Sequence, residues 1–119
     1  FILCREVAPG MQQRRWGRIV NIASSSAYSG FANSSAYCAS KHGLLGLSRS
    51  LFNEMKNDNV RTFCISPGSV QTEMGRQIKH QDPDTFIDPR EMGRFIVDTI
   101  AYDGHMIAEE VRLNRMFVQ

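Results

Sequence analysis

Two side chains four residues apart, the phenol of Tyr37 and the ammonium of Lys41, form the clearest chemical pattern in this 119-residue sequence. Residues at i and i+4 share one face of a helix, so the ammonium can lie beside the phenol. A free phenol titrates near ~10 and exchanges protons poorly at neutral pH, but a neighbouring cation stabilises the phenolate. The spacing therefore predicts that Tyr37 works as a general acid or base.

A serine cluster and a Pro-Gly pair lie where they could join this chemistry. Ser24 precedes Tyr37 by thirteen residues and is followed by Ser25 and Ser26, while Pro67-Gly68 lies further along the chain. The serines follow one apolar, β-branched run and Pro67-Gly68 follows another. Each run is typical of a buried strand. A Pro-Gly pair alone would indicate only an ordinary turn.

The elements that must position these residues follow from hydrophobic spacing and from helix-start and helix-stop residues. Asp88-Pro89 predicts a helix start, with Glu91 three residues past the cap. Pro9 predicts the end of the first helix, because an interior proline removes a backbone donor and clashes with the preceding turn. The predicted elements are a helix over 1–7, a strand over 18–23, a helix from Ser34 or Ser35 to about Asn57, a strand over 60–65, an irregular segment or lid over 69–87, a helix over 88–103 and a last strand around Val111–Leu113. The inner face of the helix over 88–103 is predicted to consist of Met92, Phe95, Ile96, Thr99 and Ile100.

This alternation of helices and strands is typical of an α/β fold, with a parallel sheet covered by helices. In such sheets ligands bind beyond the carboxyl ends of the strands. Ser24, Tyr37 with Lys41, and Pro67-Gly68 would all meet at that edge. Together they are a far more specific pattern than any one of them alone.

With these residues in place, the chain resembles the C-terminal half of a short-chain dehydrogenase/reductase. The resemblance implies the C-terminal portion of a Rossmann-type, doubly wound parallel sheet with three strands alternating with helices. Three segments carry it, in the family's order and spacing: Gly17-Arg-Ile-Val-Asn-Ile-Ala-Ser24, Tyr37-x-x-x-Lys41-His-Gly-Leu, and Ile65-Ser-Pro-Gly68-Ser-Val-Gln-Thr72. The tail lacks the Gly-Gly ending that is frequent in the family.

The resemblance implies a catalytic role for three side chains. Tyr37 would be the acid in carbonyl reduction and the base in alcohol oxidation. Lys41 would stabilise the phenolate and bind the nicotinamide ribose. Ser24 would donate to the substrate oxygen, with Ser25 and Ser26 as substitutes, and Asn21 would brace the strand and loop.

The same resemblance implies a nicotinamide cofactor, NAD or NADP. Backbone groups near Pro67, Gly68 and Val70 would contact the carboxamide, and Thr72 would add a side-chain contact. For Thr72 a loop-capping hydroxyl is the structural alternative. The substrate would be a small carbonyl or alcohol, and the whole enzyme would form a homodimer or homotetramer.

Part of the family's cofactor site has no counterpart here. No glycine-rich turn for the pyrophosphate occurs, and the family's helix asparagine would fall just before Phe1. The sequence also starts in an apolar stretch without an initiator methionine. We therefore expect residues 1–119 to be a partial NAD(P)-binding Rossmann domain without its N-terminal half, and inactive as an isolated chain.

Composition excludes several other classes. A net charge of +2 does not favour nucleic acid, and no apolar run approaches the ~20 residues that a membrane span needs. Cys4, Cys38 and Cys64 match no metal-site spacing and are expected to be buried or idle thiols in a reducing compartment. His80 and His105 have no metal-ligand partners at useful spacing. With no signal peptide at its start, the chain is expected to be cytoplasmic.

Two alternatives remain open at this point. Nucleotide-sugar epimerases and dehydratases use the same Tyr-Lys pair, although the short spacing from Tyr37 to Pro67 argues against them. A non-catalytic module for dimerisation or interaction is the other, because the long helix from Ser35 to Asn57, with the terminal helix at Phe1, resembles the surface through which members of the family form dimers.

Overall fold

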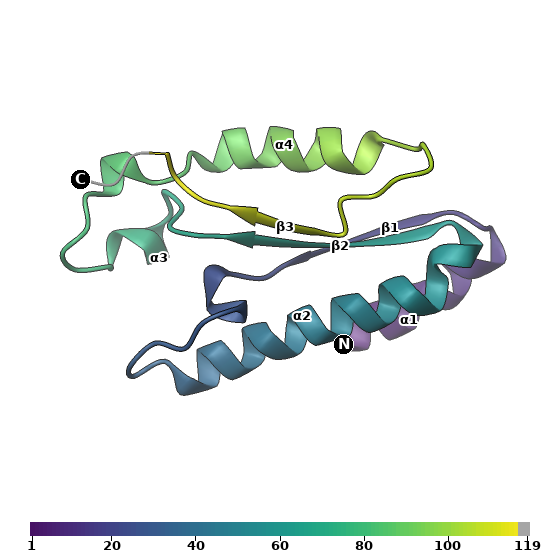
Figure 1. Ribbon diagram of the computed structural model, residues 1–119, viewed down its shortest axis with the longest axis horizontal. Helices are drawn as coiled ribbons and strands as arrows, with labels where there is room; N and C mark the ends of the chain where they lie inside the picture. Colours follow the sequence, from purple (N-terminus) through teal and green to yellow (C-terminus); the bar gives the residue numbers. More distant parts are fainter. Residues whose placement is uncertain (117–119) are drawn as a thin grey trace.

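The computed structural model describes residues 1–116, so residues 117–119 of the expected domain lie outside the described part. Helices and strands alternate along the chain (Figure 1). The elements in order are α1 (Ile2–Gln13), β1 (Gly17–Ile22), the 3₁₀ turn η1 (Ser25–Ala27), α2 (Ser35–Met55), the 3₁₀ turn η2 (Lys56–Asp58), β2 (Val60–Pro67), α3 (Glu73–Arg76), the 3₁₀ turn η3 (Pro83–Thr85), α4 (Pro89–Ala101) and β3 (Glu110–Leu113).

The strands form one parallel sheet in the order β1-β2-β3, which confirms the predicted fold class. Ile22 pairs with Ile65, and Pro67 pairs with Leu113. Helices α1 and α2 cover one face of the sheet and α4 lies over the other (Figure 1). All three strands therefore end at the same edge, which is where ligands bind in sheets of this kind.

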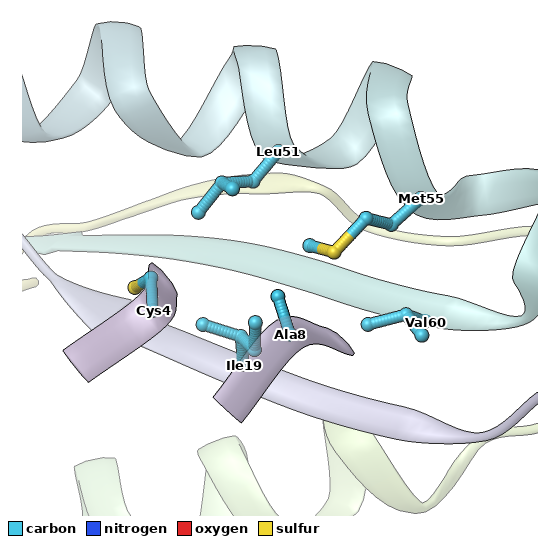
Figure 2. Close-up of a cluster of buried hydrophobic side chains, with 6 residues drawn as sticks. All are labelled: Cys4, Ala8, Ile19, Leu51, Met55 and Val60. Carbon is cyan, nitrogen blue, oxygen red and sulfur yellow. The ribbon is translucent and has the colours of Figure 1, made fainter. Parts of the chain in front are cut away.

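The core lies between the sheet and the pair α1 and α2. Figure 2 shows side chains from four elements meeting there: Cys4 and Ala8 of α1, Ile19 of β1, Leu51 and Met55 of α2, and Val60 of β2. β2 is buried along most of its length because it has a strand on each side. Cys4, Cys38 and Cys64 are free and buried, as the sequence predicts.

Helix α1 continues past Pro9 to Gln13, so the predicted end at this proline is wrong. Pro9 removes one backbone donor, but Cys4 and Ala8, which precede it, are buried against the sheet. Met11 packs against the same cluster. Tertiary burial thus outweighs the local cost of an interior proline.

Segment 69–87 is more ordered than the predicted irregular loop. Val70 and Ile87 form a parallel bridge at its base, and α3 and η3 lie between them. Arg115 also holds this segment, because its guanidinium donates to Thr85 Oγ1 at 2.9 Å and to Gln81 Oε1 at 3.1 Å. Hydrophobic periodicity could not predict these contacts, because they join residues that are distant in the sequence.

Helix α4 begins at Pro89 as predicted, and Asp88 caps it by accepting the Arg90 N–H at 2.7 Å. Its predicted inner face is only partly correct. Met92 and Ile96 are half-buried, but Phe95 is 41% exposed, and none of the helix's residues is fully buried. Among residues 1–116, no helix is long and apolar enough to cross a membrane.

The outer edge of β1 is unpaired in the described residues, because β1 is the terminal strand of the sheet. Such an edge exposes backbone donors and acceptors to other chains. We expect the 119-residue chain alone to self-associate or to melt at low temperature. Sedimentation velocity and a thermal melt test this; a monomer with a cooperative, high-temperature melt would contradict it.

Candidate active site

Ser24 lies directly beyond the end of β1. Pairing with β2 continues through Ala23, whose N–H donates to Ile65 O at 2.8 Å. Ser24 is extended and caps η1, with its Oγ accepting the Ser26 N–H at 3.1 Å. Ser26 is buried, whereas Ser24 and Ser25 are half-buried, so Ser26 is the least accessible of the three serines.

Tyr37 and Lys41 lie one turn apart near the start of α2. The Lys41 ammonium is 5.6 Å from the centroid of the Tyr37 ring and donates to Ile22 O at 3.1 Å. Ile22 ends β1, two residues before Ser24. The first turns of α2 therefore lie against the carboxyl end of β1, and Tyr37, with 42% of its surface exposed, is open to a ligand there.

Asn21 connects the strand to the helix that carries the Tyr-Lys pair. Its Nδ2 donates to Ser48 Oγ at 2.8 Å, and Ser48 is itself buried and donates to Leu44 O at 2.9 Å. The bracing role expected of Asn21 is present, but its partner is α2 rather than the loop. The role of Ser48 was not predicted from the sequence, although a polar residue on the apolar stripe of α2 could have indicated a buried hydrogen bond.

The other predicted contact residues lie at the end of β2 and in the segment after it. Pro67 is buried, and the Gly68 N–H donates to Leu113 O at 2.8 Å, which places Gly68 beside the end of β3. Val70 forms the bridge to Ile87. Thr72 caps α3, with its Oγ1 accepting the Gly75 N–H at 3.1 Å, which is the alternative role weighed for this hydroxyl.

The described residues give His42 a local contact and no cluster of metal ligands. His42 Nδ1 lies 2.9 Å from Cys38 O, one turn earlier on the same helix. In the described residues no three His, Cys, Asp or Glu side chains come together in a way that could hold a metal ion.

A charged cluster beside the Ser24 turn was missed from the sequence. The Tyr28 hydroxyl donates to Glu110 Oε2 at 3.2 Å, and Arg49 donates to Glu110 Oε1 at 2.5 Å and to Oε2 at 3.1 Å. The hydrogen bond from Arg49 lowers the pKa of Glu110, and burial raises the pKa of the Tyr28 phenol. At neutral pH the phenol is therefore the donor and the carboxylate the acceptor.

The lowered pKa of Glu110 makes stability depend on pH. A carboxylate whose pKa is lowered by folding stabilises the folded state at pH values above its unfolded pKa, here 4.5. This stabilisation is lost as the pH falls through the pKa of the folded state. We expect Arg49→Gln to lower the melting temperature at pH 7 and to have little effect well below pH 4.5. The control Arg94→Gln removes an equal charge from α4, where residues 1–116 offer Arg94 no ion pair. Equal effects of the two variants at every pH would contradict this.

Comparison with known proteins gives a family match over most of the chain. The family model described as short chain dehydrogenase matches residues 1–83. The 3-oxoacyl-[acyl-carrier-protein] reductase FabG of Rickettsia prowazekii is 32% identical over 103 residues, covering 86% of this chain and 43% of the relative. The short-chain dehydrogenase/reductase olcF of Penicillium canescens is 42% identical over 84 residues, covering 71% of this chain and 31% of the relative.

Solved structures agree with this match. A 4-hydroxyisoleucine dehydrogenase complexed with NADH superimposes with a TM-score of 0.79 at 32% identity, covering 97% of this chain and 52% of the other. A betaketoacyl-[ACP] reductase from Bacteroides thetaiotaomicron shares the fold with a TM-score of 0.78 at 22% identity, covering 96% of this chain and 47% of the other. The chain thus spans about half the length, or less, of the proteins it matches.

Proposed function

The chain belongs to the short-chain dehydrogenase family, and from this membership we propose that it carries the catalytic half of an NAD(P)-dependent oxidoreductase. The reaction transfers a hydride between the nicotinamide and a carbonyl or secondary alcohol. One observation carries the proposal: Lys41 lies 5.6 Å from the Tyr37 ring and bonds the end of β1, two residues before Ser24. That contact supports a site in which an acid–base phenol, a cation and a hydroxyl share the carboxyl edge of the sheet.

The described residues have free capacity for this chemistry. The Ser24 hydroxyl accepts the Ser26 N–H and donates to no group in residues 1–116, so its own proton is available for a substrate oxygen. Lys41 uses one of its three N–H groups on Ile22 O. The site therefore fits an oxygen-bearing substrate and a cofactor hydroxyl.

In the proposed mechanism the residues of this chain handle the proton and orient the reactants. In reduction, Tyr37 donates its phenolic proton to the carbonyl oxygen, which becomes the alcohol. Ser24 donates a hydrogen bond to the same oxygen and stabilises its developing charge. Lys41 stabilises the phenolate that remains, and in oxidation each step reverses. The nicotinamide, when bound, supplies or accepts the hydride.

Residues that follow β2 would hold the nicotinamide end of the cofactor, NAD or NADP. Gly68 suits this role because it lies at the end of β2 and a bound ring could approach its backbone closely. Pro67, Val70 and Thr72 complete the proposed contacts. The NADH complex of the 4-hydroxyisoleucine dehydrogenase supports a nicotinamide cofactor.

We also propose that residues 1–119 form the C-terminal half of a longer Rossmann domain. Coverage of 43% of the FabG relative supports this, as does the unpaired edge of β1. The preceding half would supply the strand beside β1 and the glycine-rich turn for the pyrophosphate. The longer protein would then be the active form, and it is expected in the cytoplasm.

The outer faces of α1 and α2 favour a second copy of the chain as partner. A groove of about 290 Å³ runs between these helices, and Phe1, which lines it, is 76% exposed. A side chain at Gly43 or Gly46 would meet nothing within 4 Å, so another backbone could approach α2 there. These features support the expected homodimer or homotetramer of the longer protein. The same face supports the second candidate function, a non-catalytic interaction module.

Cofactor titration of the full-length protein separates the two functions. We expect the fluorescence of NADH or NADPH to change on binding, and acetoacetyl-CoA, a 3-oxoacyl thioester, to be a suitable first carbonyl to test for turnover. The isolated 119-residue chain, which lacks a pyrophosphate site, should bind neither cofactor measurably. A full-length protein that binds neither cofactor would support the interaction module and overturn the oxidoreductase.

A further inference from the structure

The turn that Ser24 caps, η1, is stabilised by few hydrogen bonds of its own. η1 has three residues, and its internal bonds run from Ala27 N to Ser24 O at 2.9 Å and from Tyr28 N to Ser25 O at 3.1 Å. A single 3₁₀ turn is too short to be stable by itself. The position of Ser24 therefore depends on contacts from outside the turn.

Tyr28, at the end of this turn, supplies a contact that reaches across the sheet. Its half-buried ring packs against the cluster of Ala23, Ala27, Leu45 and Cys64. Its hydroxyl donates to Glu110 of β3, and the Arg112 guanidinium lies 4.7 Å from its ring centroid. One side chain thus ties the Ser24 turn to the last strand.

Glu110 is in turn held by the helix that carries the Tyr-Lys pair. Both of its carboxylate oxygens accept from Arg49, in the two-bond geometry that gives such pairs their directional preference. Arg49 lies about two turns beyond Lys41 on α2. One carboxylate therefore joins the Ser24 turn, β3 and α2.

We propose that Tyr28 and Glu110 are positioning residues, which hold Ser24 at its working distance from Tyr37, with Arg49 orienting Glu110. This rests on the proposed function, in which Ser24 and Tyr37 act on the same substrate oxygen. A small displacement of one of two groups that converge on a reacting atom lowers the rate of the chemical step much more than it weakens binding. A contact that served stability alone would not change the rate of the chemical step in this way.

Three variants of the full-length protein test the inference. Tyr28→Phe removes the hydroxyl but keeps the ring beneath Arg112, Glu110→Ala removes the acceptor, and Glu110→Gln keeps an acceptor for Tyr28 without the charge. The control Arg15→Gln breaks an exposed ion pair with Asp58 that joins the end of α1 to η2, away from Ser24. Acetoacetyl-CoA with NADH or NADPH serves for kinetics, and amide hydrogen exchange reports on Ser26, Ala27 and Tyr28.

We expect Tyr28→Phe and Glu110→Ala each to lower kcat by about ten-fold with little change in the cofactor KM. Both should speed exchange in the turn, and the double variant should be no worse than Glu110→Ala, because both act through one link. Glu110→Gln should recover part of the loss. Arg15→Gln should change neither kcat nor exchange in the turn.

Two results would overturn the inference. One is exchange at Ser26–Tyr28 in Tyr28→Phe and Glu110→Ala that matches Arg15→Gln. The other is a lower melting temperature with unchanged kcat. Absence of turnover in the wild type with either cofactor would instead count against the proposed function, and the exchange result would still decide whether Tyr28 and Glu110 hold the turn.

Discussion

Replacing Tyr37 by phenylalanine in the full-length protein should lower turnover by about a hundred- to ten-thousand-fold, the usual contribution of a positioned general acid or base. The ring and its contact with Lys41 remain, so only the transferable proton is lost. Because the phenol is exposed at the edge where the strands end, its removal leaves no buried group unpaired. Cofactor binding and the melting temperature should therefore stay close to those of the wild type.

The control for this variant is Tyr102→Phe. Tyr102 is similarly exposed, at 48%, but follows α4, away from Ser24 and Lys41. Steady-state kinetics and NADH or NADPH titration of both variants give the comparison. Wild-type turnover in Tyr37→Phe would show that Tyr37 is not the general acid and base.

Replacing Lys41 by methionine should damage both catalysis and cofactor binding. Methionine keeps much of the apolar stem but removes the ammonium beside Tyr37 and its bond to Ile22 O. Loss of a charged hydrogen bond to the cofactor costs about 1.5–3 kcal/mol, or roughly ten- to a hundred-fold in affinity. Turnover should fall further, because the phenolate loses its neighbouring cation.

The chain contains a matched control for Lys41→Met. Lys56 lies four residues after Phe52, with its ammonium 5.4 Å from that ring centroid, a geometry close to that of Lys41 over Tyr37. Lys56→Met thus removes the same kind of contact at the opposite end of α2. We expect its kinetics and cofactor affinity to match the wild type. Equal losses in the two variants would show that Lys41 acts through general charge and not at the site.

Local patterns predicted most elements because their causes are local. Asp88-Pro89 set the start of α4 through a cap within the first turn, and the apolar stripe of α2 marked the helix that covers the sheet. The same reasoning failed at Pro9, where burial of Cys4 and Ala8 carries the helix through a residue that locally disfavours it. It also underestimated segment 69–87, whose order comes from the bridge of Val70 to Ile87 and from Arg115.

In the candidate site, too, local contacts could be predicted from the sequence and distant contacts could not. Tyr37 and Lys41 could be found by spacing, because four residues on a helix define one face. Asn21 with Ser48, and Tyr28 with Glu110, could not be paired by spacing, since 27 and 82 residues separate them. Their contacts exist only once the register of β1, β2 and β3 is set.

By itself, the sequence determined the order of helices and strands, the parallel α/β class and the face of α2 that carries a phenol beside a cation, because each follows from periods of two to four residues. The tertiary structure decided which distant side chains meet beside this pair: Ser48 with Asn21, and Glu110 with Tyr28 and Arg49. The physical reason is that hydrogen bonds and burial between remote segments depend on strand register and helix packing, which no local period contains.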